Sequence, residues 1–74
     1  IFLQVGAFTS RDNAESLRQR LTPTVSDIFI EPWDTAQRSL YRVRVGPLMS
    51  EEEANALAAK LLEIGIHSPR IIRD

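Results

Sequence analysis

The sequence contains no cysteine, which removes two common means of stabilising a small protein. Neither a disulfide framework nor a thiolate metal site can supplement the hydrophobic core. A chain of 74 residues is also short enough to bury only about 60% of its unfolded surface. The sequence therefore predicts a single domain over residues 1–74 that depends on packing alone.

Excess charge and long apolar runs are also lacking. Nine basic and ten acidic residues give a formal net charge of −1, so the chain lacks the positive excess typical of nucleic-acid-binding domains. No apolar run approaches the length of a membrane span, and no charged start of a leader precedes Ile1. We therefore expect an excised domain that does not insert into a membrane, with any signal peptide or lipid anchor of its parent lying upstream.

Catalytic and metal-binding patterns are scarce. His67 is the only histidine and has no second ligand at metal-binding spacing, so we expect it at the surface. Asp27 and Glu31 are expected to share one face of a strand, where an open sheet lacks the enclosed pocket that an acid and base pair needs. They are interpreted as solvated carboxylates or as acceptors for a polar ligand. The sequence predicts no catalytic residue, no metal, no cofactor and no enzyme activity.

Two halves of the chain share a pattern. Residues 4–21 align with residues 44–61, so that Val5-Gly6 matches Val45-Gly46. The apolar positions of the following helices also match, namely Ala14, Leu17 and Leu21 with Ala54, Leu57 and Leu61. This pattern predicts two strand-turn-helix units. Each glycine is expected at the end of a strand, where the backbone turns without a Cβ in the way.

Capping signals bound the two predicted helices. Ser10 precedes a helix over about residues 11–21. Ser50 and Glu53 form a capping box, and Gly65 offers a left-handed stop, so the second helix spans about residues 51–64. Alternating residues predict strands over residues 2–5, 28–31, 41–45 and 70–73, with a hairpin turn near residues 34–37. The order βαββαβ predicts an α+β, ferredoxin-like fold, a four-stranded antiparallel sheet with two helices on one face.

Strand alternation separates the side chains that face the helices from those on the other side of the sheet, here called the open face. Val5, Val43 and Val45 are expected beneath the helices, together with Leu3, Ile28 and Ile30. The open face is expected to carry Phe2, Gln4, Phe29, Glu31, Trp33, Arg42 and Arg44. We expect the polar members Gln4, Arg42 and Arg44 to be exposed. In the last strand Ile71 and Ile72 are both apolar, so the alternation does not determine which of them faces the helices.

The open-face set has two interpretations. The arginines can be ordinary solubilising residues that pair with Glu31 or Asp27, and the aromatics Phe29 and Trp33 can plug an edge or an interface. Alternatively, the aromatics and arginines together form a binding surface.

Two strings, Gln4-Val5-Gly6-Ala7-Phe8 and Tyr41-Arg42-Val43-Arg44-Val45-Gly46-Pro47-Leu48, each precede a serine-capped Ala-x-x-Leu helix. In order and separation they resemble the SPOR domain family over essentially the whole chain. Leu48 differs mildly from the aromatic residue usual after the second Gly-Pro. The resemblance implies a ferredoxin-like fold and a peptidoglycan-binding module of the bacterial periplasm. It implies a preference for denuded glycan strands, which lack stem peptides and are enriched at the division septum. It also implies the C-terminal module of a septal lytic transglycosylase, with a parent anchored to the outer membrane as a lipoprotein.

The resemblance places the glycan site on the open face, which implies contacts from Gln4, Arg42, Arg44 and the second-strand aromatics. The chemistry agrees, because sugar CH faces stack on aromatic rings and sugar hydroxyls and acetamides need polar partners. Two rival interpretations remain: an RNA-recognition module, which shares this topology and is disfavoured by the net charge, and a domain whose open sheet docks a protein. We expect a monomer that binds no nucleic acid.

Overall fold

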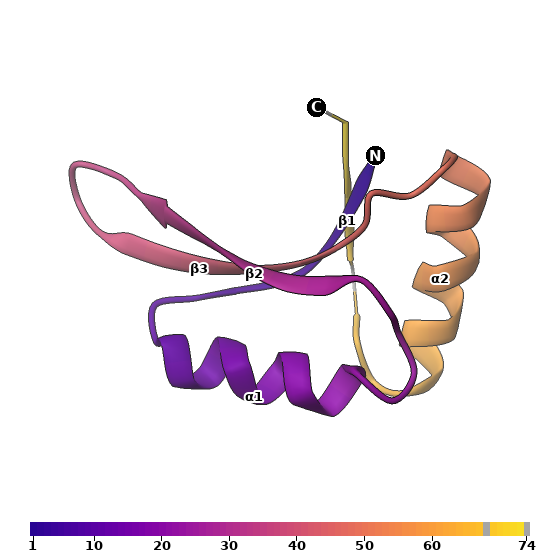
Figure 1. The fold of residues 1–74 in the computed structure, drawn as a ribbon, viewed down its shortest axis with the longest axis horizontal. Coiled ribbons are helices and arrows are strands. Elements are labelled where there is room, and N and C mark those ends of the chain that lie inside the picture. The colour runs from indigo at the N-terminus through magenta and orange to yellow at the C-terminus, as the bar shows by residue number, and fades with distance from the viewer. Residues whose placement is uncertain (68, 74) are drawn as a thin grey trace.

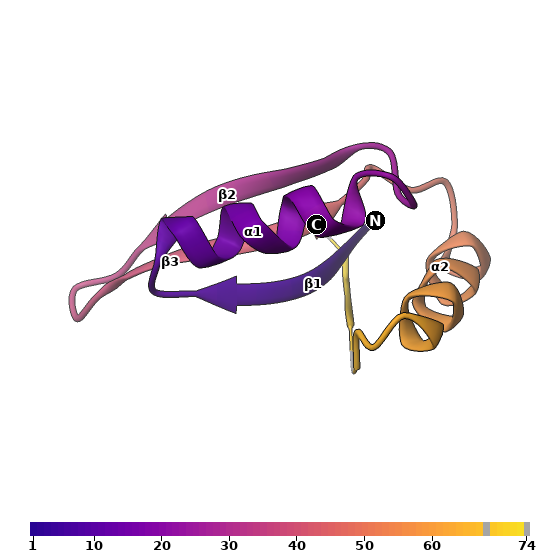
Figure 2. The ribbon, with the colours of Figure 1, turned by 90° about the horizontal axis from the view of Figure 1, so that it is seen from below.

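The computed structural model describes residues 1–67 and 69–73. Its elements follow the order β1 (Phe2–Phe8), α1 (Arg11–Leu21), β2 (Ile28–Asp34), β3 (Ser39–Val45), α2 (Glu51–Glu63) and β4 (Arg70–Ile72). The strands form one antiparallel sheet in the order β2-β3-β1-β4, so the first and last strands of the chain pair directly. Figure 1 shows α1 running along the sheet below β2 and β3, and α2 beside the far end of the sheet. In Figures 1 and 2 the β2–β3 hairpin projects beyond both helices.

The hydrophobic core lies between the sheet and the two helices. Leu3 and Val43 from the sheet and Leu21 and Leu61 from the helices are completely buried. Val5 and Val45 are also buried, as the alternation predicts, and Ile28 and Ile30 pack against the same cluster. The strand alternation therefore identifies the helix-covered side of the sheet correctly. Ile71 packs on this core as well, so β4 turns Ile72 toward the open face beside Phe2.

Strand β1 departs from the sequence prediction at its glycine. The strand was expected to end near Val5, but it continues to Phe8, and Gly6 lies inside it. Leu3 pairs with Val45, while Gly6 pairs with Val43, so the register shifts by one residue between them. This β-bulge lets Val5 and Gly6 both face the helices. A Cβ on Gly6 would approach Leu17 Cδ2 to 3.0 Å, so glycine is needed there for close packing of α1.

The helix boundaries follow the predicted capping residues. Ser10 Oγ accepts a hydrogen bond from the Asn13 amide at 3.3 Å, and Ser50 Oγ accepts one from the Glu53 amide at 3.2 Å. Glu53 Oε2 reaches back to the Met49 amide at 3.0 Å, one residue before the expected partner of a capping box. Helix α2 ends at Glu63, and Gly65 adopts the expected left-handed conformation with a φ of 94°.

Replacing Ser50 with alanine should lower the free energy of unfolding by about 1 kcal/mol, because the Glu53 amide loses its acceptor. Urea denaturation followed by circular dichroism measures the change. Ser16→Ala is the matched control, since Ser16 is exposed inside α1 and caps nothing. It should leave stability unchanged or slightly higher, because alanine favours the helix. Equal destabilisation by both substitutions would contradict the capping role.

Candidate functional site

The open face of the sheet brings the seven predicted site residues onto one surface. Across three strands, Phe29 of β2 pairs with Arg44 of β3, and Arg44 pairs with Gln4 of β1. In the next row of the sheet, Glu31 pairs with Arg42. Because side chains alternate along a strand, the remaining residues Phe2 and Trp33 lie on this face too. The sheet thus aligns aromatic and charged side chains over all three strands.

Glu31 lies between the two arginines. Both of its carboxylate oxygens accept a hydrogen bond from Arg44 Nη1, each at 3.1 Å, and Oε1 also accepts one from Arg42 Nη2. The hydrogen bond from Arg42 lowers the pKa of the Glu31 carboxyl, and the positive charges of Arg44 and Arg42 act in the same direction, against the opposing effect of desolvation. Glu31 therefore stays ionised to a lower pH than an ordinary glutamate. The ion pairs between Glu31 and the two arginines, which the structural interpretation of the open face expects, are therefore present.

The expected exposure of Arg44 is wrong, because only 4% of this residue is accessible. Arg44 does point to the open face, but side chains of the two neighbouring strands, Phe2 of β1 and Glu31 of β2, contact its guanidinium group. Its guanidinium carbon lies 5.0 Å from the centroid of the Phe2 ring. The Phe2 ring also makes an edge-to-face contact with Phe29, with ring centroids 5.9 Å apart and an interplanar angle of 79°. Gln4, also expected to be exposed, is half-buried.

Trp33 and Arg42 form the more accessible part of the surface. The Arg42 guanidinium carbon lies 4.1 Å from the centroid of the Trp33 ring, a cation–π distance. Arg42 is itself half-buried, contrary to the expected exposure, because Trp33 and Glu31 hold it against the sheet. Trp33 remains 46% exposed. One ring face thus contacts the arginine, and the rest of the indole stays accessible to a ligand.

The structure adds one polar residue to this surface that the sequence did not identify. Arg70 of β4 pairs with Gln4, which extends the row of Phe29, Arg44 and Gln4 to the fourth strand. Its side chain is exposed. The signal was hidden because two adjacent isoleucines leave the alternation of β4 undetermined. Once Ile71 is assigned to the core, the alternation places Arg70 on the open face.

Asp27 does not share a face with Glu31, which corrects the sequence interpretation. Its φ of 59° takes the chain out of extended geometry just before β2 begins, so the alternation of β2 does not extend back to this residue. Aspartate tolerates this left-handed region better than most residues because its short side chain can hydrogen-bond locally. Asp27 instead borders a pocket on the helix side of the molecule.

Among residues 1–67 and 69–73, no group of three or more His, Cys, Asp and Glu side chains could hold a metal ion. The helices of that same part of the chain are also too short or too polar to cross a membrane. The open face offers rings for stacking and guanidinium groups for oxygen ligands.

Comparisons with known proteins agree with this geometry. The sequence pattern of the SPOR domain matches residues 1–71. The endolytic peptidoglycan transglycosylase RlpA of Pseudomonas aeruginosa, in strains UCBPP-PA14 and PAO1, is 34% identical over 74 residues. That alignment covers 99% of this chain but only 22% of those proteins, so the chain spans about a fifth of the length of the curated relatives it matches.

A solved structure supports the same relationship. The crystal structure of the RlpA SPOR domain from Pseudomonas aeruginosa superposes with a TM-score of 0.89 at 32% sequence identity. The match covers 99% of this chain and 97% of that one. The ferredoxin-like arrangement predicted from the order of strands and helices is thereby confirmed.

Proposed function

Because the chain belongs to the SPOR domain family, a family of peptidoglycan-binding modules, we propose that its open face recognises denuded glycan strands without catalysing any reaction. The observation that carries the proposal is the accessible Trp33 ring beside Arg42, next to the row of Phe29, Arg44 and Gln4. Phe2 and Glu31 complete the surface by covering and orienting the arginines.

The composition of this surface suits a polysaccharide. A sugar ring presents apolar CH groups that stack on an indole, and its hydroxyl and acetamide groups hydrogen-bond to arginine and glutamine. An open sheet also accepts a long polymer, which a closed pocket would not. RNA is a poorer ligand for the same face, because Glu31 offsets the charge of the two arginines that it contacts.

The absence of stem peptides should favour binding for two reasons. A denuded strand exposes the lactyl carboxylates of its muramic acid units, and guanidinium groups bind carboxylates through charge-assisted hydrogen bonds. A stem peptide converts each carboxylate into an amide and adds bulk next to the sheet. Arg42 and the exposed Arg70 are the cations best placed to meet such a carboxylate.

The module would act within a longer protein. We expect the parent to be a septal lytic transglycosylase similar to RlpA, in the periplasm and attached to the outer membrane as a lipoprotein. Residues 1–74 would then form its single C-terminal binding domain, which acts as a monomer. Denuded strands concentrate at the division septum, so affinity for them would deliver the catalytic part of the parent to that site.

A pull-down with two kinds of purified sacculi tests the proposal. Amidase-treated sacculi, whose glycan strands have lost their stem peptides, should retain several times more of the domain than untreated sacculi. Glu63→Gln, a change on the exposed surface of α2, is the matched control and should leave both values unchanged. Equal retention would contradict recognition of denuded strands, and release of soluble muropeptides by the domain would contradict a non-catalytic role.

A further inference from the structure

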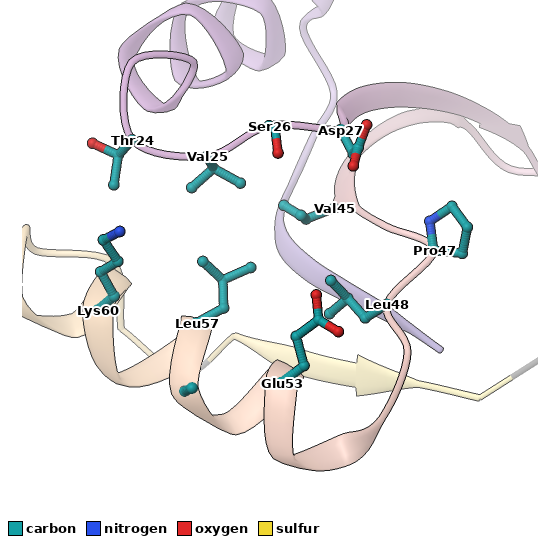
Figure 3. A pocket seen from close by; sticks show the side chains of 11 residues that line it. Thr24, Val25, Ser26, Asp27, Val45, Pro47, Leu48, Glu53, Leu57 and Lys60 are labelled. Carbon is teal, nitrogen blue, oxygen red and sulfur yellow. The ribbon is translucent and has the colours of Figure 1, made fainter.

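A pocket of about 310 Å³ lies on the helix side of the molecule, away from the open face. It is formed by the loop between α1 and β2, the end of β3, the segment after it, and α2 (Figure 3). Small-molecule sites usually measure about 300–1,000 Å³, so this pocket suits a small ligand. It is separate from the proposed glycan surface because its β3 residue, Val45, faces the helices.

The middle of the pocket is apolar. Val25 and Val45 are almost completely buried, and the half-buried Leu48 and Leu57 pack against the same core cluster. Figure 3 shows Val25 and Leu57 facing each other across the cavity. A small aliphatic group placed there would exchange water for hydrocarbon contacts on two sides.

The two ends of the pocket carry opposite charges. Figure 3 shows Lys60 at one end, with Glu53 and Asp27 toward the other. Glu53, Leu57 and Lys60 follow the four-and-three spacing of one helix face, so all three project from the same side of α2. The two charged residues of α2 are seven positions apart, which separates them by about 10 Å along the helix axis. The acidic and basic side chains therefore cannot easily satisfy each other.

The charged groups are largely available to a ligand. Within the described part of the chain, neither Asp27 nor Lys60 uses its side chain in an ion pair or a hydrogen bond. The Asp27 backbone is anchored, because its carbonyl accepts the Gly46 amide at 3.1 Å. Glu53 Oε2 accepts a hydrogen bond from the Met49 amide, whereas no hydrogen bond within the described residues uses Oε1. The carboxylate points toward the pocket (Figure 3).

We propose that this pocket binds a tripeptide in its zwitterionic form. The peptide ammonium group lies by Asp27 and Glu53, its terminal carboxylate lies by Lys60, and a small apolar side chain contacts Val25 and Leu57. The length follows from the charge separation, since an extended tripeptide spans about 10 Å. The site is independent of the open face, so peptide and glycan can bind together.

Amide chemical-shift mapping with trialanine tests the assignment. Trialanine carries both terminal charges at neutral pH, whereas N-acetyl-trialanine-amide carries neither. Trialanine should shift amides of residues 24–27, 48 and 53–60, and the blocked peptide should bind at least tenfold more weakly. Lys60 is the only lysine in the sequence, so its side-chain ammonium signal gives a second, direct readout of the carboxylate end.

Three substitutions and one control separate binding from folding. Lys60→Gln and Asp27→Asn should each weaken trialanine binding at least fivefold, while Lys60→Arg, which keeps the positive charge, should retain most of it. Asparagine tolerates the left-handed backbone of residue 27, so Asp27→Asn should preserve the loop. Asp34→Asn, at the end of β2 and outside the pocket, is the matched control and should bind normally.

Several outcomes would overturn the proposal. These are the absence of shifts at the pocket at millimolar trialanine, equal binding of the blocked peptide, and wild-type affinity in both charge-removing variants. Shifts confined to the open face would also overturn it. None of these results bears on the glycan proposal. Retention on sacculi tests another ligand, the glycan, at another surface, the open face.

Discussion

Replacing Glu31 with glutamine should lower the free energy of unfolding by about 2–3 kcal/mol, although it changes a single atom of an accessible side chain. Glutamine is isosteric but uncharged, so Arg42 and Arg44 would lose the carboxylate between them. The Arg44 side chain is only 5% exposed and cannot recover its hydration in water. The estimate lies below the range for a fully buried pair because 38% of the Glu31 side chain is accessible.

This loss should be a large fraction of the total free energy of unfolding of the domain. A domain of 74 residues has a total stability of about 4–11 kcal/mol. Urea denaturation at neutral pH, followed by circular dichroism, measures the difference. Glu15→Gln is the matched control, because Glu15 pairs with Arg18, whose side chain is 34% exposed and can regain its hydration in water. Comparable stability of Glu31→Gln and the wild type would show that the buried arginine does not depend on this carboxylate.

The pH dependence provides an independent check on Glu31. Its pKa is lower in the folded chain than the ordinary value of 4.5, so the unfolded chain takes up the proton first as the pH falls. The stabilisation by Glu31 is therefore complete above about pH 4.5 and is lost as the pH falls through the lower, folded pKa. Wild-type stability should decrease more steeply than that of Glu31→Gln below pH 4.5. Parallel curves would contradict the shift.

The sequence was sufficient for the architecture because its local signals agree with one another. The alternation around Val43 and Val45 is strong, a serine caps each helix, and Gly65 marks the end of the second helix. The bulge at Gly6 was missed for a physical reason. Val5-Gly6 and Val45-Gly46 look alike as sequence, but Gly6 lies inside a paired strand, whereas Gly46 follows the end of β3 with a φ of 141°. Only pairing with a neighbouring strand distinguishes the two.

The sequence predicted which residues share the open face, but not how deeply each of them is buried. Parity correctly places Arg44 opposite the helices. Its burial depends on side chains of two other strands, because Phe2 of β1 contacts the guanidinium and also contacts Phe29 of β2. Such a contact between distant segments leaves no periodic signal in the chain. Asp27 was misplaced for a related reason, since a single left-handed residue interrupts the strand alternation without changing the sequence pattern.

The burial of Phe29 also changes what each aromatic should contribute to binding. Trp33 is 46% exposed, whereas Phe29 is half-buried against Phe2. Trp33→Ala should therefore weaken binding of a denuded glycan oligosaccharide about tenfold, or about 1.4 kcal/mol, through loss of the stacking ring. Folding should survive, because Trp33 covers Arg42 and lies outside the hydrophobic core. Phe29→Ala should mainly lower stability.

Titration calorimetry with matched denuded and peptide-bearing oligosaccharides measures this effect. Trp33 is the only tryptophan in the sequence, so its fluorescence in the wild type should also change on binding and report the contact directly. Trp33→Phe, which keeps an aromatic ring, is the matched control and should retain most of the affinity. Because Arg42 contacts the indole, the fluorescence change should be smaller for peptide-bearing strands, whose lactyl groups offer that arginine no carboxylate. If Trp33→Ala binds denuded strands with wild-type affinity, the glycan does not stack on this ring and the open face must engage it elsewhere.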